Sequence, residues 1–330
     1  MSNDANMEAT QATILDHLSN ELDFRIKQGD RKGEAKALCG IAEHYWENAD
    51  AAEALKYYRR AHKIYKQVED GVGQADTLSD IGMVYHFGED WQKATRYYKQ
   101  ALALYEDADD KQGMAIVLGN MGLLSRIKGD YKKALTHLEH SLYINREMGD
   151  KDGIATMLGN MGMVYHDMGD PDMALGYHEQ ALRIDREIQS KLGEAGDLGN
   201  IGLAYHVKGE LDKALEYHQQ ALGINRSIME KLGEASDLGN MGLVYRDRGE
   251  YDKALELFMQ AFDIDEQIGD RLGQAAQLGN MGSAYLARGE LDKAYDCYHD
   301  ALDVYKHLGV KSKAKYITEQ IEVVRARMRE

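Results

Sequence analysis

The sequence of 330 residues has one proline and two cysteines. So little proline in a long chain favours long helices joined by tight glycine turns over an ordinary mixed fold, because proline interrupts helices. Cys39 and Cys297 are far apart and form no CxxC pair. This spacing argues against a disulfide framework or a thiolate zinc site and suits a reducing compartment. We therefore expect a cytoplasmic protein.

Basic residues and long apolar runs are also scarce. With 40 Lys and Arg against 56 Asp and Glu, the formal net charge is −16. Binding to phosphates needs clustered Lys and Arg, so we expect no nucleic acid partner. No stretch approaches the roughly 18 apolar residues of a membrane span, and the first residues lack the basic and apolar regions of a signal peptide. We therefore expect no membrane partner either.

A period of 40 residues runs through the chain. The triplet Leu-Gly-Asn recurs at 118–120, 158–160, 198–200, 238–240 and 278–280. A glycine follows two residues after each of these asparagines, and three residues later comes a tyrosine or, in the third copy, Ser125. Seven copies cover residues 31–310 without a linker, so internal repetition decides the fold.

Each copy is predicted to form two helices. In the fourth copy, Gly149 and Asp150 are typical of a helix end followed by a helix start, and the first helix is expected to reach about Met168. Pro171 then suits the first turn of the second helix. The pattern predicts sixteen helices and no strand.

The two ends match only part of a repeat. Residues 8–28 resemble a second helix alone, and residues 312–328 resemble a first helix alone. Both are predicted to cap the stack, because terminal repeats need a more polar outer face. We expect one domain over residues 1–330.

The repeat contains the pattern Gly–x2–Tyr–x8–Ala–x6–Ala, as in Gly162, Tyr165, Ala174 and Ala181. This pattern resembles the tetratricopeptide repeat over almost the entire chain. The 40-residue period and the Leu-Gly-Asn triplets are most similar to the repeats of Pins/LGN-type polarity adaptors and of kinesin light chain. The resemblance implies an all-α fold, an α-solenoid superhelix of helix-turn-helix repeats whose first helices line a concave groove.

An asparagine in the middle of each first helix is the main candidate for binding. Asparagine is a mediocre helix former, so its recurrence there needs a reason. Its carboxamide can pair with both the N–H and the C=O of an extended peptide. Two alternatives stay open: the side chain braces the neighbouring repeat, or it is an unchanged copy from duplication. The candidates for peptide binding are Asn120, Asn160, Asn200, Asn240 and Asn280.

Two further rows accompany the asparagines. Three residues beyond them, on the same helix face, stand the apolar residues Leu123, Met163, Leu203 and Leu243. Six residues beyond them stand Arg126, His166, His206 and Arg246. The apolar row is expected to line the groove, and the cationic row to favour a ligand with acidic groups. The alternative for the apolar row is burial between neighbouring first helices, and for the cationic row it is stacking between repeats or a solvated edge. Gly40 and Asp80 replace asparagine in the first two copies, so binding is expected at the third to seventh.

No metal, cofactor or catalytic site is predicted. One histidine per repeat, with helices about 10 Å apart, provides no tetrahedral ligand set. The glycine turns match no phosphate-binding motif, and no nucleophile–base grouping is evident. We therefore expect a non-enzymatic adaptor that binds an extended or short helical segment of a partner protein. A monomer is expected. The alternatives are a self-assembling homo-oligomeric scaffold and a peptide-gated regulator.

Overall fold

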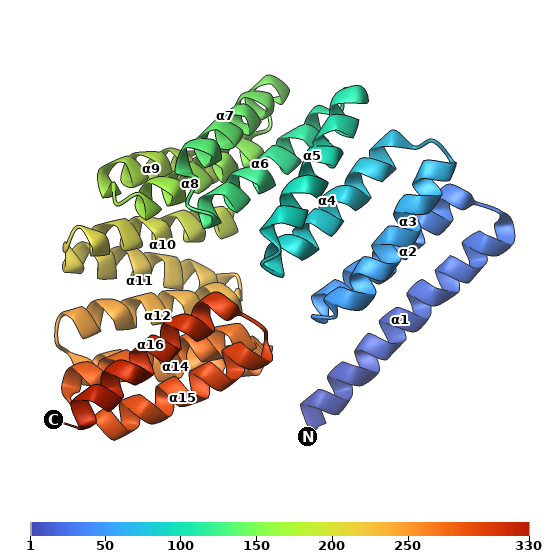
Figure 1. Ribbon diagram of the computed structural model, residues 1–330. Helices are drawn as coiled ribbons and strands as arrows, with labels where there is room; N and C mark the ends of the chain where they lie inside the picture. The colour runs from blue at the N-terminus through green and yellow to red at the C-terminus, as the bar shows by residue number, and fades with distance from the viewer. Residues whose placement is uncertain (1, 330) are drawn as a thin grey trace. The chain divides into compact units, whose positions relative to one another are not determined.

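In the computed structural model, the backbone is described for residues 2–329 and the side chains for residues 13–329. Residues 2–329 form sixteen α-helices and no strand, so the predicted all-α fold of paired helices is confirmed. The helices, labelled in Figure 1 where there is room, are α1 (Ser2–Gln28), α2 (Arg31–Glu47), α3 (Ala51–Gln67), α4 (Gly71–Phe87), α5 (Trp91–Asp107), α6 (Lys111–Ile127), α7 (Tyr131–Met148), α8 (Lys151–Asp167), α9 (Pro171–Glu187), α10 (Lys191–Val207), α11 (Leu211–Ser227), α12 (Lys231–Asp247), α13 (Tyr251–Ile268), α14 (Arg271–Arg288), α15 (Leu291–His307) and α16 (Lys311–Met328).

The helices begin and end at the residues that mark the repeat. Before α8, Gly149 is left-handed with φ of 70°, and the side chain of Asp150 accepts a hydrogen bond from the Gly153 N–H at 3.1 Å. This cap satisfies one of the N–H groups that the first helical turn leaves without a backbone partner. Pro171 opens α9, where its missing N–H costs nothing. The boundaries predicted for the fourth copy are therefore confirmed to within one residue.

Not every turn uses glycine. Among residues 2–329, six non-glycine residues take the left-handed conformation with φ between 52° and 59°: Ala49, Glu69, Glu89, Asp109, Gln189 and Met229. This conformation costs an L-residue about 1–2 kcal/mol, because Cβ crowds the following carbonyl oxygen. The backbone conformation of the turns is thus the same from copy to copy, whereas the residue type at the left-handed position varies.

Small residues bring the two helices of a repeat together. In the fourth copy, Ala174 and Ala181 are buried, as the sequence predicts. Gly162 faces the ring of His178, and a Cβ at residue 162 would lie 2.6 Å from His178 Nε2. Only glycine lets this ring lie against the α8 backbone, because interiors are close-packed.

The helices form two compact units, one ending at Gly149 and the other beginning at Asp150. The first unit contains α1–α7 and the second contains α8–α16. In the second unit, the first helices of successive repeats, α8, α10, α12 and α14, contact one another in order. The organisation as one domain stays a prediction. Among the described residues, no helix combines the length and apolarity needed to cross a membrane.

Candidate functional site

Four of the five candidate asparagines lie in the second unit. Asn160, Asn200, Asn240 and Asn280 occupy the same position of α8, α10, α12 and α14. Because these four helices contact one another in order, the asparagines form a row across one face of the unit. Asn120 lies on α6, in the first unit.

The carboxamides of this row differ in their partners. Asn160, Asn200 and Asn240 are half-buried, and their side chains make no hydrogen bond to any residue that the structure describes. Asn280 Nδ2 instead donates to Gln277 Oε1 on its own helix, at 3.2 Å. One of the two alternatives was that the asparagines brace the neighbouring repeat. The structure gives this alternative no support at Asn160, Asn200 and Asn240. A half-buried carboxamide without a protein partner keeps its donors and its acceptor for another molecule.

The apolar row lies beside the asparagines. Met163, Leu203 and Leu243 are half-buried on α8, α10 and α12. Leu243 also packs against the buried cluster that contains Phe258, so part of its apolar surface belongs to the core. Leu123 has the corresponding position on α6 and is also half-buried. The row is thus partly core and partly exposed.

The cationic row is largely engaged with acidic side chains. His206 Nε2 lies 2.8 Å from Asp247 Oδ2, although these residues belong to successive repeats. Arg246 donates through Nε to Asp247 Oδ1 at 2.8 Å and through Nη1 to Ser283 Oγ at 3.1 Å. His166 Nδ1 lies 3.5 Å from Asp167 Oδ1.

These contacts join the fifth, sixth and seventh repeats. Burial opposes ionisation of Asp247, but the hydrogen bonds from Arg246 and His206 outweigh it and lower the pKa of this carboxyl. The contacts favour stacking between repeats as the role of His206 and Arg246. Arg126 lies half-buried on α6, in the first unit. An acidic ligand stays a prediction.

Sequence reasoning missed a layer of buried polar side chains in the second unit. Between the fourth and fifth repeats, His178 Nδ1 lies 3.6 Å from Asp197 Oδ1, and Asp185 forms a hydrogen bond with Asp197. Burial raises the pKa of both carboxyls, and repulsion between the two adds to this at Asp185. Burial lowers the pKa of His178 to about 4. The histidine is therefore neutral near pH 7, and the pKa of each carboxyl of the pair is raised to about 7.

The next repeat contains a related group. His218 Nδ1 lies 3.6 Å from Asp237 Oδ1, and Asn225 Nδ2 donates to Asp237 Oδ2 at 2.8 Å. Comparison of positions 40 residues apart could have revealed this layer. One such column reads Tyr98, Leu138, His178, His218, Phe258 and Tyr298.

The described residues contain no group of three or more His, Cys, Asp or Glu side chains placed to hold a metal ion. The two thiols are unpaired. Burial raises the pKa of Cys39, and burial with the nearby Asp300 and Asp296 raises the pKa of Cys297 to about 11. Both thiols are therefore protonated near neutrality, which disfavours nucleophilic chemistry.

The fold and its repeat period match a known family. The tetratricopeptide repeat family matches residues 33–107, 113–187, 197–267 and 277–312. No curated protein matches the chain.

Several solved structures are similar in fold. A Rap protein complexed with Competence and Sporulation Factor is 19% identical with a TM-score of 0.63, over 89% of this chain and 76% of that chain. A signal transduction ATPase with a tetratricopeptide repeat sensor from Pyrococcus horikoshii is 19% identical with a TM-score of 0.61, over 88% of this chain and 44% of that chain. Aspartyl phosphate phosphatase F from Bacillus subtilis is 15% identical with a TM-score of 0.67, over 86% of this chain and 73% of that chain.

At these identities the likeness concerns the fold. The paired helices, the 40-residue period and the family match over most of the sequence agree with one another. The chain belongs to the tetratricopeptide repeat family.

Proposed function

We propose that the protein is a non-catalytic interaction module whose second unit binds an extended segment of a partner protein along the asparagine row. The observation that carries this proposal is the set of three half-buried carboxamides, Asn160, Asn200 and Asn240, without a hydrogen-bond partner among the described residues. Their common position on contacting helices lets one linear ligand reach all three.

The dimensions suit an extended peptide. Packed helices lie about 8–10 Å apart, and an extended chain rises about 3.3 Å per residue. Successive asparagines would therefore meet roughly every third residue of the ligand. Met163 and Leu203 would contact apolar side chains between these residues, as in other modes of peptide recognition.

The comparisons support a protein partner in a general sense. The Rap protein, which is similar in fold, was solved in complex with Competence and Sporulation Factor. We further propose that the asparagines work as in the Pins/LGN and kinesin light chain repeats, which the repeat sequence resembles, and that binding takes place in the cytoplasm.

The test uses a displayed library of random twelve-residue peptides, selected against the whole protein. Selected peptides are then titrated by calorimetry against the variant Asn160→Ala/Asn200→Ala/Asn240→Ala. Each carboxamide lost removes about 1 kcal/mol of hydrogen bonding, so the triple variant should bind roughly a hundredfold more weakly.

The matched control is Gln219→Ala/Gln220→Ala, which removes two exposed carboxamides from α11, a second helix. It should bind like the unmodified protein. Circular dichroism verifies that both variants are folded. Equal affinity of a folded triple variant for every selected peptide would refute the role of the asparagines.

A further inference from the structure

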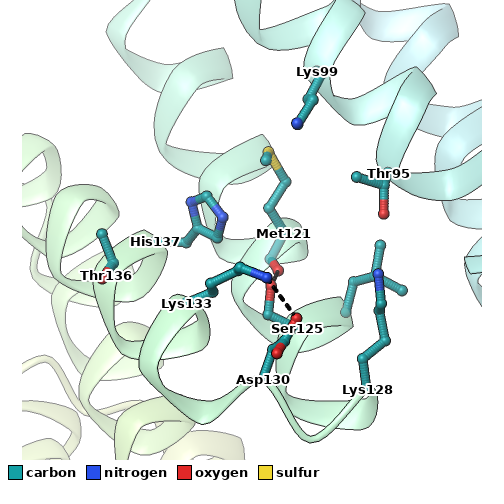
Figure 2. A pocket seen from close by; sticks show the side chains of 10 residues that line it. Thr95, Lys99, Met121, Ser125, Lys128, Asp130, Lys133, Thr136 and His137 are labelled. Carbon is teal, nitrogen blue, oxygen red and sulfur yellow. Dashed lines mark hydrogen bonds and ion pairs between the residues drawn. The ribbon is translucent and has the colours of Figure 1, made fainter. Parts of the chain in front are cut away.

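A cavity of about 370 Å³ lies in the first unit, away from the asparagine row of the second. Thr95 and Lys99 of α5 line one side, and Lys133, Thr136 and His137 of α7 line the other (Figure 2). The end of α6 and the turn after it complete the lining. This volume lies within the range of small-molecule sites in proteins.

The cavity lies where the repeat lacks a stacked pair of tyrosine rings. In four copies a tyrosine of the first helix stacks on a tyrosine twelve residues later, with ring centroids 5.2–5.6 Å apart. In the third copy Ser125 and His137 occupy these two positions. Ser125 is the only residue other than tyrosine at its position among the seven copies. A hydroxymethyl group cannot fill the space of a phenol ring, so a cavity remains.

The lining is basic, although the chain as a whole is acidic. It contains three lysines and His137 but a single carboxylate, Asp130, which lies 2.8 Å from Lys133 Nζ. Lys99 and Lys128 form no ion pair with any described residue. Lys128 joins Lys133 in lowering the pKa of Asp130, so one carboxylate faces three ammonium groups around the cavity, in a molecule of net charge −16. Such a local cluster attracts an anion even when the total charge does not.

The other lining groups suit the organic part of a ligand. Thr95, Ser125 and Thr136 each donate their hydroxyl hydrogen to a backbone carbonyl of their own helix, at 2.7, 2.8 and 3.0 Å. Their oxygens therefore retain lone pairs that can accept hydrogen bonds from the hydroxyl groups of a ligand. Met121 and Leu124 add apolar surface.

We propose that this cavity binds a small phosphate ester with a hydroxyl-bearing body, its phosphate held by Lys99 and Lys128. None of the described residues that line the cavity is an arginine, so the anion would be held by ammonium groups alone. Lysine acts as a point charge and suits a tetrahedral dianion. The ester can come as a free metabolite or as a phosphorylated side chain of another protein.

The state of His137 gives a spectroscopic readout. Burial, together with the neighbouring His140, Lys99 and Lys133, lowers the pKa of this imidazole. A phosphate dianion in the cavity would offset the positive charges, so the pKa of His137 should rise on binding. A ligand bound elsewhere would leave this pKa unchanged.

The experiment titrates the whole protein with glucose 6-phosphate, glucose, citrate, and a serine peptide with and without phosphorylation. Calorimetry gives the affinities, and NMR follows the His137 resonance. We expect saturable binding of a phosphate ester that weakens with salt, together with a rise in the pKa of His137. Binding of glucose 6-phosphate identifies a free metabolite as a source, and binding of the phosphopeptide identifies a modified protein. The proposal is overturned when neither binds, or when glucose or citrate binds as tightly.

Variants separate charge from shape. Lys99→Gln/Lys128→Gln should weaken binding about tenfold per lysine. Lys132→Gln removes an equal charge from α7 outside the cavity and serves as the control for each lysine. Ser125→Tyr/His137→Tyr introduces the stacked tyrosine pair found in four other copies and should abolish binding with all lysines kept. Unchanged affinity in both folded double variants, checked by thermal unfolding, overturns the proposal.

Discussion

The second repeat, in the first unit, and the fourth and fifth repeats, in the second unit, fill the same positions with side chains of different chemistry. In the first unit, the phenol ring of Tyr98 lies against Gly82 and that of Tyr105 lies against Gly113. In the fourth and fifth repeats, which belong to the second unit, the equivalent positions hold polar groups. They are His178 against Gly162, Asp185 against Gly193, His218 against Gly202 and Asn225 against Gly233.

This difference shows that the backbone of the repeat fixes where a side chain packs and leaves its chemistry open. An aromatic ring contributes apolar burial at any pH below its own ionisation. A carboxyl or imidazole in the same place depends on its protons and must find hydrogen bonds. His178 Nδ1 and Asp197 Oδ2 have none among the described residues. The fourth and fifth repeats should therefore be less stable than the second repeat and more sensitive to pH.

The largest effect should come from removing a ring in each unit. Tyr98→Ala should destabilise the first unit by about 3–5 kcal/mol, because a large, fully buried side chain leaves a cavity. His178→Ala should cost less than half as much, because it also removes a buried nitrogen without a partner.

Hydrogen exchange followed by mass spectrometry measures both variants, because it reports the stability of each unit separately. Lys132→Ala, at an exposed position, should change neither unit. Equal losses at the two sites would contradict the contrast between aromatic and polar packing.

A middle-sized effect should follow from exchanging an aspartate and an asparagine between repeats. Asp185→Asn reproduces the Asn225–Asp237 hydrogen bond of the next repeat. It should stabilise the second unit by about 1–3 kcal/mol at pH 8, because one buried carboxyl disappears. The reciprocal variant Asn225→Asp should destabilise the unit at pH 8. Chemical unfolding at a series of pH values measures both.

The shifted pKa values of Asp197 and His178 predict how the stability of the second unit changes with pH. The folded pKa of Asp197 is raised to about 7, so its contribution to stability is complete below about pH 4 and is lost as the pH rises to about 7. The lowered pKa of His178 acts in the opposite sense, and its contribution is lost as the pH falls from about 6.5 to about 4. Asp185→Asn should reduce the loss of stability between pH 4 and 7 that is due to Asp197. It should keep the loss of stability at low pH that is due to His178. An unchanged decline between pH 4 and 7 would show that the carboxyl pair does not control it.

The smallest effect should appear at the turns. Among the described residues, four of the six left-handed non-glycine residues lie in the first unit. Glu69→Gly, at an exposed turn of that unit, should stabilise it by about 0.5–1 kcal/mol, because glycine adopts positive φ without strain. Gly209→Ala should destabilise the second unit by a similar amount. Urea unfolding measures the stability of both variants. A loss of stability in Glu69→Gly would contradict the inference that Glu69 is strained at positive φ.

The sequence predicted the helices well and the candidate site only in part. The helix boundaries in the fourth copy follow from local residues such as Asp150 and Pro171, so the pattern alone locates them. The role of the cationic row could not be predicted from the sequence. The contact between His206 and Asp247 spans 41 residues of sequence and depends on how two repeats pack. The total charge likewise concealed the basic cavity around Lys99 and Lys128.

The sequence by itself determined the repeat, its paired helices and the family, because a strict period and local turn chemistry act within one copy. The tertiary structure decided which side chains keep a free polar group. Asn160 and Asn200 have no hydrogen-bond partner among the described residues, Asn280 hydrogen-bonds within its own helix, and Ser125 borders a cavity. These outcomes depend on neighbours from other helices and other copies, whose identities differ even where the repeat residue is the same.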